Sequence, residues 1–457
     1  MQHAGANQEA ARARPVQAGR AVIVGLGRTG LSCARHLHSR GVEFAVTDSR
    51  TAPPEAAALM RLAPEAPTRF GGFDHGLLEG AAQIVASPGV ALSEPFLASA
   101  AQRGVPVVGD IELFARAAQA PVAAITGTNG KSTVTSLVAH MAAAAGARVL
   151  AGGNLGRPAL DLLEAPTPDL YVLELSSFQL ETTHSLRTAA AAVLNVTADH
   201  MDRYGSLQEY ADAKARIFRG CAAAVVNLDD PAVRAMSHSA GRVFGFSVHA
   251  DPAADYRLAQ QGEDVALMCD GEALISMSQL RITGMHNAAN ALAALAMCRA
   301  LGLPRRECVE ALRSFAGLPH RSQCVAQIGG VRYVNDSKGT NVGATIAAVR
   351  GMSGPLVLIA GGQAKGQDFA ALAAVLRGRT RRVVLIGEDA KLLEHALRDV
   401  AVVEFAGDMR EAVLLAARAA REGDTVLLSP ACASLDMFRD YAHRGEEFAA
   451  AVRELEQ

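Results

Sequence analysis

Short apolar runs that alternate with helix-like segments recur along almost the whole of this 457-residue chain. The runs RAVIVG, PVAAITG and PLVLIAGG are typical of buried strands, and each is followed by a segment with helical periodicity. Alternation of this kind indicates parallel sheets whose strands are joined by crossover helices. The pattern therefore predicts an α/β fold.

The α/β pattern falls into three blocks, and the length of the chain is too great for one ordinary domain. Between Gly241 and Thr283, short polar–apolar alternations indicate a small antiparallel addition to the second block. We predict a disordered polar tail over 1–20, a Rossmann-like first domain over 21–109, a central P-loop-type ATPase domain with a mostly parallel sheet over 110–317, and a Rossmann-like third domain over 318–457.

Charge, cysteine spacing and hydropathy narrow the class of protein. A net charge of −2 gives no general reason to expect nucleic acid or an anionic membrane as a partner. The 7 cysteines are scattered without a C-x-x-C pair, which favours reduced thiols in a cytosol. No apolar run approaches the roughly 20 residues needed to cross a bilayer. We expect a soluble cytoplasmic protein with no membrane insertion, and a monomer is the default.

The stretch VGLGRTG places Gly25, Gly27 and Gly30 between a predicted strand and a predicted helix. Asp48 ends the next strand, which is close to the dinucleotide fingerprint. Such glycines let backbone amides approach a diphosphate at a helix N-terminus. NAD or FAD, another nucleotide diphosphate and a simple tight turn all stay open, because the pattern does not say which diphosphate is bound.

A second glycine-rich loop, TGTNGKST, lies between an apolar strand and a helix. It is shorter than the standard P-loop, which has a glycine where this chain has Ile125. Its context still fits a phosphate site, with amides converging on oxygens, Lys131 on the terminal phosphates and a hydroxyl available for Mg²⁺. A phosphate-binding loop is favoured over a turn that carries a lysine by accident.

Polar residues follow two strands of the central block. Glu174 comes directly after an apolar strand, and a buried carboxylate needs a partner such as a metal ion. Asn195, Asp199 and His200 follow the next strand, and strand C-termini are where sheet ligands gather. His200 is therefore a metal-ligand candidate. Lys214 lies among apolar residues of a helix, and its position alone favours an ordinary surface lysine.

The motifs TGTNGKST, LELSSFQLE, GLPHR, NDSKGTN and LSPACASLD occur in this order. From about residue 20 onward the chain thus resembles the Mur ligase family of peptidoglycan synthesis, whose phosphate loop is itself the short form. The resemblance implies an ATP-dependent amide ligase that adds D-glutamate to UDP-N-acetylmuramoyl-L-alanine through an acyl phosphate. A sister ligase for another amino acid is the nearest alternative, and an NAD-linked oxidoreductase is a more distant one.

The resemblance also implies roles for individual residues. Catalysis would involve Lys131, Glu174, His200 and Lys214. Two Mg²⁺ ions would be held by Ser132, Glu174, His200 and a Lys214 that CO₂ has carbamylated. ATP would be bound by Gly127, Thr128, Asn129, Gly130, Lys131, Ser132, Thr133, Asn287, Asn290, Arg321 and Asp336. The UDP substrate would be bound by Gly27, Arg28, Thr29, Gly30, Asp48, Ser49, Ser87, Pro88, Gly89 and Asn154. D-Glutamate would be bound by His200, Lys338, Thr340, Lys365, Ser434 and Tyr441.

Overall fold

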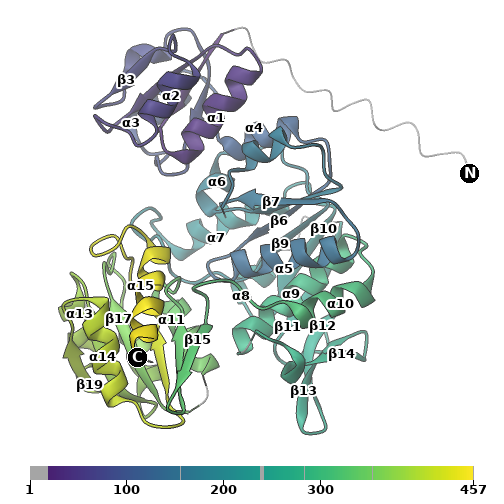
Figure 1. Cartoon of the computed structure of the whole chain (residues 1–457). Helices are drawn as coiled ribbons and strands as arrows, with labels where there is room; N and C mark the ends of the chain where they lie inside the picture. Colours follow the sequence, from purple (N-terminus) through teal and green to yellow (C-terminus); the bar gives the residue numbers. More distant parts are fainter. Residues whose placement is uncertain (1–18, 155, 237–240, 283, 353, 456–457) are drawn as a thin grey trace, which may run out of the picture.

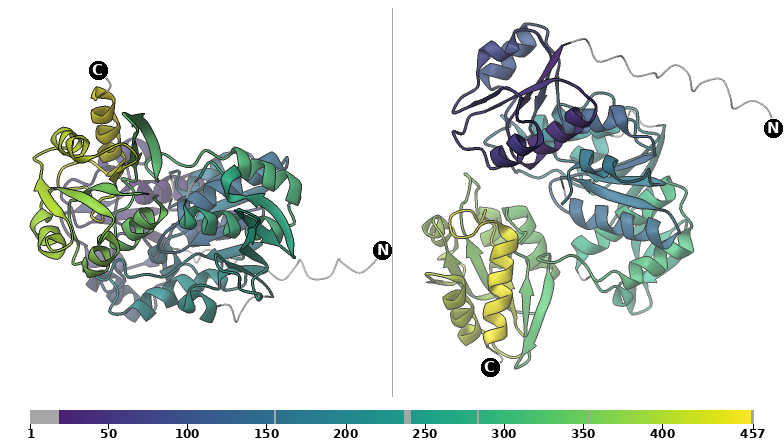
Figure 2. Two further views of the ribbon diagram at one scale, coloured as in Figure 1. Left: turned by 90° about the horizontal axis from the view of Figure 1, so that it is seen from below. Right: turned by 45° about the horizontal axis from the view of Figure 1, so that its top comes forward.

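The computed structural model contains three α/β domains in chain order, which run from purple through blue and green to yellow in Figure 1. The first and third domains both lie against the second (Figure 2). The predicted three-domain α/β class is confirmed, while the exact domain boundaries stay predictions. Most of the tail predicted over residues 1–20 lies outside the described residues. The structure describes residues 19–154, 156–236, 241–282, 284–352 and 354–455.

The first domain is a parallel sheet in the order β3-β2-β1-β4-β5, covered on both faces. Its strands are β1 (Arg20–Val24), β2 (Phe44–Asp48), β3 (Thr68–Phe70), β4 (Ala81–Ala86) and β5 (Val107–Val108). Its helices are α1 (Arg28–Ser39), α2 (Ala56–Leu62), η1 (His75–Leu78) and α3 (Pro95–Gln102). Ile23 packs in the core on the face that α1 and α2 cover, and Val22 packs in the core on the face that α3 covers. Successive side chains of a strand alternate between the two faces of a sheet. The sequence does not predict β3, which is short and only partly buried.

The second domain is built on a nine-stranded sheet in the order β14-β13-β12-β11-β10-β9-β6-β8-β7. Its strands are β6 (Val122–Thr126), β7 (Val149–Gly153), β8 (Leu170–Glu174), β9 (Ala190–Val193), β10 (Ala223–Asn227), β11 (Arg242–Ser247), β12 (Tyr256–Gln261), β13 (Asp264–Cys269) and β14 (Glu272–Ser276). The antiparallel addition predicted from Gly241 begins only with the pairing of β12 and β13. β11 still runs parallel to β10. The last four residues of β11 are all buried, and such a continuous buried run is typical of a parallel strand.

Helices cover both faces of this sheet. They are α4 (Asp110–Ala117), α5 (Lys131–Ala144), η2 (Ala159–Glu164), α6 (Ser177–Glu181), α7 (Leu207–Ala215), η3 (Arg216–Phe218), α8 (Pro231–Ala235), η5 (Met277–Gln279), α9 (Met285–Ala300) and α10 (Arg305–Ser314). One face packs on α5, α9 and α10, and the other packs on α4, η2 and η3. The phosphate-loop helix α5 is thus held by a large apolar core.

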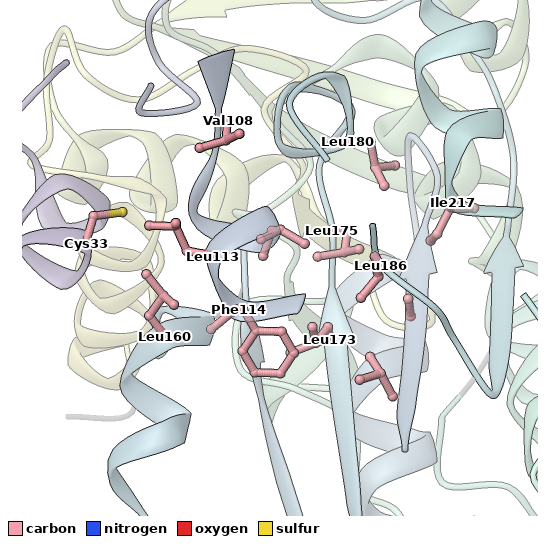
Figure 3. Close-up of a cluster of buried hydrophobic side chains, with 14 of the residues drawn as sticks. Cys33, Val108, Leu113, Phe114, Leu160, Leu173, Leu175, Leu180, Leu186 and Ile217 are labelled. Carbon is pink, nitrogen blue, oxygen red and sulfur yellow. The ribbon is translucent and has the colours of Figure 1, made fainter. Parts of the chain in front are cut away.

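One apolar core continues from the first domain into the second (Figure 3). Cys33 comes from α1, Phe114 from α4, Leu160 from η2 and Leu173 from β8. The Phe114 ring meets the Tyr171 ring edge to face, with centroids 5.1 Å apart. The first two domains are therefore joined by buried side chains as well as by the chain itself.

The third domain contains a six-stranded sheet in the order β15-β16-β20-β17-β18-β19. Its strands are β15 (Gln323–Ile328), β16 (Val331–Asn335), β17 (Leu356–Gly361), β18 (Thr380–Ile386), β19 (Val402–Phe405) and β20 (Thr425–Leu428). Its helices are α11 (Val342–Gly351), α12 (Ala370–Leu376), α13 (Ala390–Leu397), α14 (Met409–Ala419) and α15 (Tyr441–Glu454). The antiparallel edge strand β15 is not predicted from the sequence, because its residues are exposed or half-buried. Across the described part of the chain, no helix is long and apolar enough to cross a membrane.

Candidate active site

The short phosphate loop is tightly built at the start of α5. Lys131 Nζ donates to the backbone carbonyls of Gly127 and Thr128, each at 2.9 Å. Gly130 is left-handed with φ 83°, and a Cβ atom there would lie 2.4 Å from Asn290 Oδ1. The positive φ favours glycine here, and any larger residue would also have to displace the Asn290 side-chain amide. The missing glycine of the standard motif, at Ile125, falls inside the buried strand β6, so the loop is shorter but keeps its place before a helix N-terminus.

A cavity of about 300 Å³ surrounds this loop, and we call it the phosphate-loop cavity. Side chains from two domains line it. Its lining includes, from the second domain, Thr128, Asn129, Gly130, Lys131, Ser132, Asn154, Glu174, His200 and Lys214. The third domain contributes Arg321, Lys338, Thr340, Asn341, Lys365 and Gln367. All four predicted catalytic residues are therefore brought together, although they are far apart in the sequence.

Glu174 has one satisfied and one unsatisfied carboxylate oxygen. Its Oε1 accepts a hydrogen bond from Asn154 Nδ2 at 2.7 Å. Its Oε2 is buried and has no hydrogen-bond partner among the described residues. An unpaired buried carboxylate oxygen is costly, and a cation such as Mg²⁺ would satisfy it. Glu174 therefore fits a metal-binding role.

The protein side chains do not form a complete metal cage. Within the described ranges, no group of three or more His, Cys, Asp or Glu side chains is placed to hold a metal ion. Mg²⁺ is commonly bound by one or two protein ligands together with substrate phosphates and water. Ser132 lies at the start of α5, and its Oγ accepts from Arg321 at 2.5 Å. A magnesium site here would thus need phosphate oxygens in addition to Ser132 and Glu174.

Lys214 is buried, so the interpretation as a surface lysine is wrong. Only 1% of it is exposed, and its Nζ donates to the Gly127 carbonyl at 3.0 Å. The same Nζ lies 4.2 Å from the centroid of the Tyr210 ring. Burial, helped by the nearby charge of Lys131, lowers the pKa of Lys214 well below its usual value. A lowered pKa makes the neutral amine accessible, and only the neutral amine is a nucleophile.

His200 lies at the edge of the phosphate-loop cavity in a left-handed conformation, with φ 58°. Its ring packs edge to face on Phe178, with centroids 4.9 Å apart. Its Nε2 is 3.8 Å from a carboxylate oxygen of Asp199. Burial lowers the pKa of His200, so the ring is neutral over more of the physiological pH range. A neutral imidazole with an exposed edge is suited to bind a metal ion.

A second cavity, of about 590 Å³, lies between the first and second domains, and we call it the Gly25-loop cavity. Its lining includes most of the residues predicted to hold the UDP substrate: Gly27, Arg28, Thr29, Asp48, Ser49, Ser87, Pro88, Gly89 and Asn154. Gly30 does not line it. A Cβ atom at Gly30 would lie 2.1 Å from the Gly25 carbonyl oxygen, so this glycine allows α1 to approach the strand.

The Asp48 carboxylate is already occupied by the protein. It accepts hydrogen bonds from the Leu26 amide at 2.6 Å and from the Arg50 amide at 2.8 Å, and Arg50 Nε and Nη2 add two more at 2.9 and 2.7 Å. Burial acts to raise the pKa of Asp48, but these hydrogen bonds outweigh it and lower the pKa to about 2. Asp48 thus fixes the glycine loop and Arg50, and this arrangement does not favour the ribose contact of an NAD enzyme.

A third cavity, of about 270 Å³, lies between the second and third domains beside α9, and we call it the Asn290 cavity. Its lining includes seven residues predicted for ATP, three of which (Asn129, Gly130 and Arg321) also line the phosphate-loop cavity; the others are Thr133, Asn287, Asn290 and Asp336. Gly127 lines neither cavity. Asp336 accepts from Ser429 Oγ at 2.7 Å and from the Ser322 amide at 3.0 Å. Burial raises the pKa of Asp336 to about 6.

The residues predicted for D-glutamate divide into two groups. His200, Lys338, Thr340 and Lys365 line the phosphate-loop cavity, whereas Ser434 and Tyr441 do not. Tyr441 lies behind Lys338, whose Nζ is 3.9 Å from the centroid of the tyrosine ring. Ser434 is buried, and its carbonyl accepts from the Phe438 amide at 2.8 Å. Burial lowers the pKa of Lys338 to about 8, with a contribution from Arg321.

Asn341 is a site residue that the sequence did not single out. Its Nδ2 donates to Asp199 Oδ2 at 3.0 Å and to Asn129 Oδ1 at 3.4 Å, so the third domain contacts the phosphate loop directly. Its Oδ1 caps α11 by accepting from the Ala344 amide at 2.8 Å. An Asn at the end of NDSKGTN and before an apolar helix was a detectable capping signal, but the contact across domains was not.

Comparison with known proteins agrees with this geometry. Residues 19–109 match the Mur ligase MurD-like N-terminal domain, 125–298 match the Mur ligase middle domain, and 320–432 match the glutamate ligase domain of Mur ligases. The chain therefore belongs to the Mur ligase family, whose members use ATP and Mg²⁺.

Two relatives specify the branch of the family. A protein from Nitrosococcus oceani is 53% identical over 97% of this chain and 98% of its own length, and one from Methylobacillus flagellatus is 50% identical over 95% and 97%. Both are named UDP-N-acetylmuramoylalanine–D-glutamate ligase. The UDP-N-acetylmuramate–alanine ligase of Thermotoga maritima has a similar fold, with a TM-score of 0.61, 20% identity and coverage of 96% of this chain and 100% of that one.

Proposed function

We infer that this chain is an ATP-dependent amide ligase that joins D-glutamate to UDP-N-acetylmuramoyl-L-alanine in peptidoglycan precursor synthesis. One observation carries the inference. A single cavity contains the phosphate-loop Lys131, the half-satisfied carboxylate of Glu174, and Lys338 and Lys365 from the third domain. The names of the two relatives described above, which match nearly the full chain, support the same reaction.

The reaction begins by activating a carboxylate, which is a poor electrophile. The γ-phosphoryl group of ATP is transferred to the terminal carboxylate of UDP-N-acetylmuramoyl-L-alanine, which gives an acyl phosphate and ADP. Lys131 would neutralise charge on the transferring group, and Arg321, which reaches Ser132 Oγ from the third domain, would add a second cation. Asn154 lines both the Gly25-loop cavity and the phosphate-loop cavity, so it would orient the end of the sugar nucleotide toward the loop.

Metal binding would use the side chains that the geometry leaves available. Ser132 and Glu174 would hold one Mg²⁺ ion, and His200 with a carbamylated Lys214 would hold another. The bound ions supply positive charge that stabilises phosphoryl transfer. The buried amine of Lys214, with its lowered pKa, fits reaction with CO₂, which would convert it to an anionic oxygen ligand.

D-Glutamate would be bound from the third domain. Lys338 and Lys365 would pair with its two carboxylates, and Thr340 would add a hydroxyl contact. The amine of D-glutamate attacks the acyl phosphate carbon, loses a proton, and the tetrahedral intermediate expels phosphate as the amide forms. Tyr441 would support Lys338 from behind, and Ser434 would act through the loop that carries it.

The other properties follow from this function. The partners would be small molecules: the sugar nucleotide, D-glutamate and ATP. A cytoplasmic location is proposed because ATP and nucleotide sugars are found there, and a monomer is proposed as the default.

The test measures phosphate release from ATP and Mg²⁺ by the full-length chain with UDP-N-acetylmuramoyl-L-alanine. D-Glutamate, L-glutamate, diaminopimelate and L-alanine are added separately. Release that depends on D-glutamate alone is expected, and Lys131→Ala should abolish it while Lys391→Ala, at an exposed lysine, should not. Release with another amino acid would identify a sister ligase instead. No release with any of them would contradict the ligase assignment.

A further inference from the structure

Gln367 connects three backbone segments at the edge of the phosphate-loop cavity. Its Oε1 accepts a hydrogen bond from the Val342 amide at 2.9 Å. Its Nε2 donates to the Ala364 carbonyl at 3.0 Å and to the Ala431 carbonyl at 3.3 Å. Both ends of the side-chain amide are therefore engaged with the backbone of the third domain.

Each of these segments carries a residue proposed to hold D-glutamate. Val342 follows Thr340 by two positions, Ala364 directly precedes Lys365, and Ala431 precedes Ser434 by three. The three segments come from different connections of the sheet, at the start of α11, after β17 and after β20. Gln367 is thus placed to set their relative positions.

Two residues in these segments have an unfavourable backbone conformation. Lys365 has φ 51° and Ala431 has φ 58°, and neither is glycine. Left-handed residues of this kind persist only where surrounding contacts hold them. Gln367 bonds the carbonyl of Ala431 itself and the carbonyl of the peptide that enters Lys365. On the other side, Asp389 Oδ2 accepts from the Ala364 amide at 2.7 Å, so the peptide units before and after Ala364 are each held by a side-chain hydrogen bond.

We propose that Gln367 is a positioning residue for the amino-acid substrate: it fixes Lys365 relative to Thr340 and Ser434 and so sets the spacing of the groups that hold two carboxylates. This inference rests on the proposed function. Gln367 acts through Lys365 because its own amide is used by the backbone. Loss of its hydrogen bonds should therefore weaken amino-acid binding more than ATP binding.

The test compares Gln367→Met with Gln363→Met in the full-length enzyme. Methionine has a similar length but none of the three hydrogen bonds. Gln363 lies in the same loop, and its side chain extends toward Glu388 Oε2 at 3.4 Å instead of joining the three segments. We expect Gln367→Met to raise KM for D-glutamate about tenfold, which corresponds to about 1.4 kcal/mol. KM for ATP should stay within about twofold, because the backbone groups that Gln367 bonds all belong to the third domain. The melting temperature should fall by only a few degrees, because the variant loses hydrogen bonds but little apolar contact. Gln363→Met should match the wild type.

Amino-acid selectivity gives a second readout. In the wild type, D-glutamate should be preferred over D-glutamine, which lacks the side-chain carboxylate, and Gln367→Met should reduce the ratio of kcat/KM values. Gln367→Asn keeps the amide but is too short to span the segments, and it serves if the methionine variant folds poorly. Wild-type KM and selectivity in a folded Gln367 variant would overturn the inference alone. Absence of D-glutamate-dependent phosphate release by the wild type would overturn the proposed function and this inference with it.

Discussion

The two junctions between domains differ in the contacts that hold them: one is an apolar core and the other consists of polar contacts. Between the first and second domains, Cys33, Phe114 and Leu160 share one buried apolar core. Asp161 of η2 reinforces it by accepting from Ser32 Oγ at 2.5 Å and from Arg35 at 2.6 Å. Between the second and third domains, no described cluster has buried apolar members from both sides. That junction contains polar contacts such as Arg321 to Ser132 and Asn341 to Asp199.

This difference separates a fixed site from an adjustable one. Opening an apolar core exposes apolar surface to water, and this costs about 25 cal/mol of free energy per Å² exposed. When polar contacts between domains break, the same groups form hydrogen bonds to water, so the net free-energy cost is much smaller. The Gly25-loop cavity lies at the apolar junction and should keep its shape. The phosphate-loop and Asn290 cavities lie at the polar junction, so we expect rotation of the third domain to close them around ATP and D-glutamate.

The largest expected effect is on the apolar junction. Phe114→Ala removes a fully buried ring from the core shared by the first two domains, and the free energy of unfolding of that unit should fall by about 3–5 kcal/mol. Urea unfolding monitored by circular dichroism measures this free energy, and scanning calorimetry of thermal unfolding shows which transition shifts. Phe448→Ala is the matched change, because Phe448 is equally buried in a core of the third domain alone. If both variants shift one common transition equally, the two junctions do not differ as described.

A smaller effect, on catalysis instead of stability, is expected at the polar junction. Arg321→Ala removes the side chain that reaches Ser132 from the third domain, and kcat/KM for ATP should fall about a hundredfold, or about 2.7 kcal/mol. The melting temperature should change by only a few degrees, because little apolar surface is lost. Arg313→Ala, which removes a surface pair with Glu310, is the control and should keep full activity. A large loss of stability in Arg321→Ala would show that this junction is structural.

The smallest expected effect is a dependence of kcat/KM for D-glutamate on pH, caused by Lys338 at the polar junction. Burial lowers the pKa of Lys338 to about 8, so its charge is present below that pH and is lost above it. A neutral Lys338 pairs poorly with a carboxylate, and kcat/KM for D-glutamate should therefore decline above about pH 8, where it reports the free enzyme. The amine of D-glutamate titrates as well. To remove its contribution, the pH profile of kcat/KM for the wild type is divided by the profile of Lys338→Arg, whose guanidinium stays charged. A flat ratio between pH 7 and 9.5 would contradict a role for the Lys338 charge.

Local patterns were enough to predict the parts of the fold and site that depend on neighbours in the chain. The strands with continuous apolar runs, the two glycine loops and the polar residues at strand ends were all predicted in the right places. β3 and β15 were missed because their half-exposed residues give no continuous run. The burial of Lys214 depends on Gly127, 87 residues away, and the contacts of Asn341 and Gln367 also join distant segments. No local spacing records such contacts.

The three cavities share walls, and this has a consequence for inhibitor design. Asn154 lines both the Gly25-loop and phosphate-loop cavities, and Asn129, Gly130, Arg321 and Lys338 line both the phosphate-loop and Asn290 cavities. A single compound with one group in each of two neighbouring cavities would need only a short tether. Tethering makes the second contact intramolecular and can raise affinity by on the order of 10²–10⁴-fold. A compound whose tether passes Asn154 has one end in the Gly25-loop cavity, at the apolar junction that should keep its shape. The length of that tether can therefore be chosen before the third domain closes.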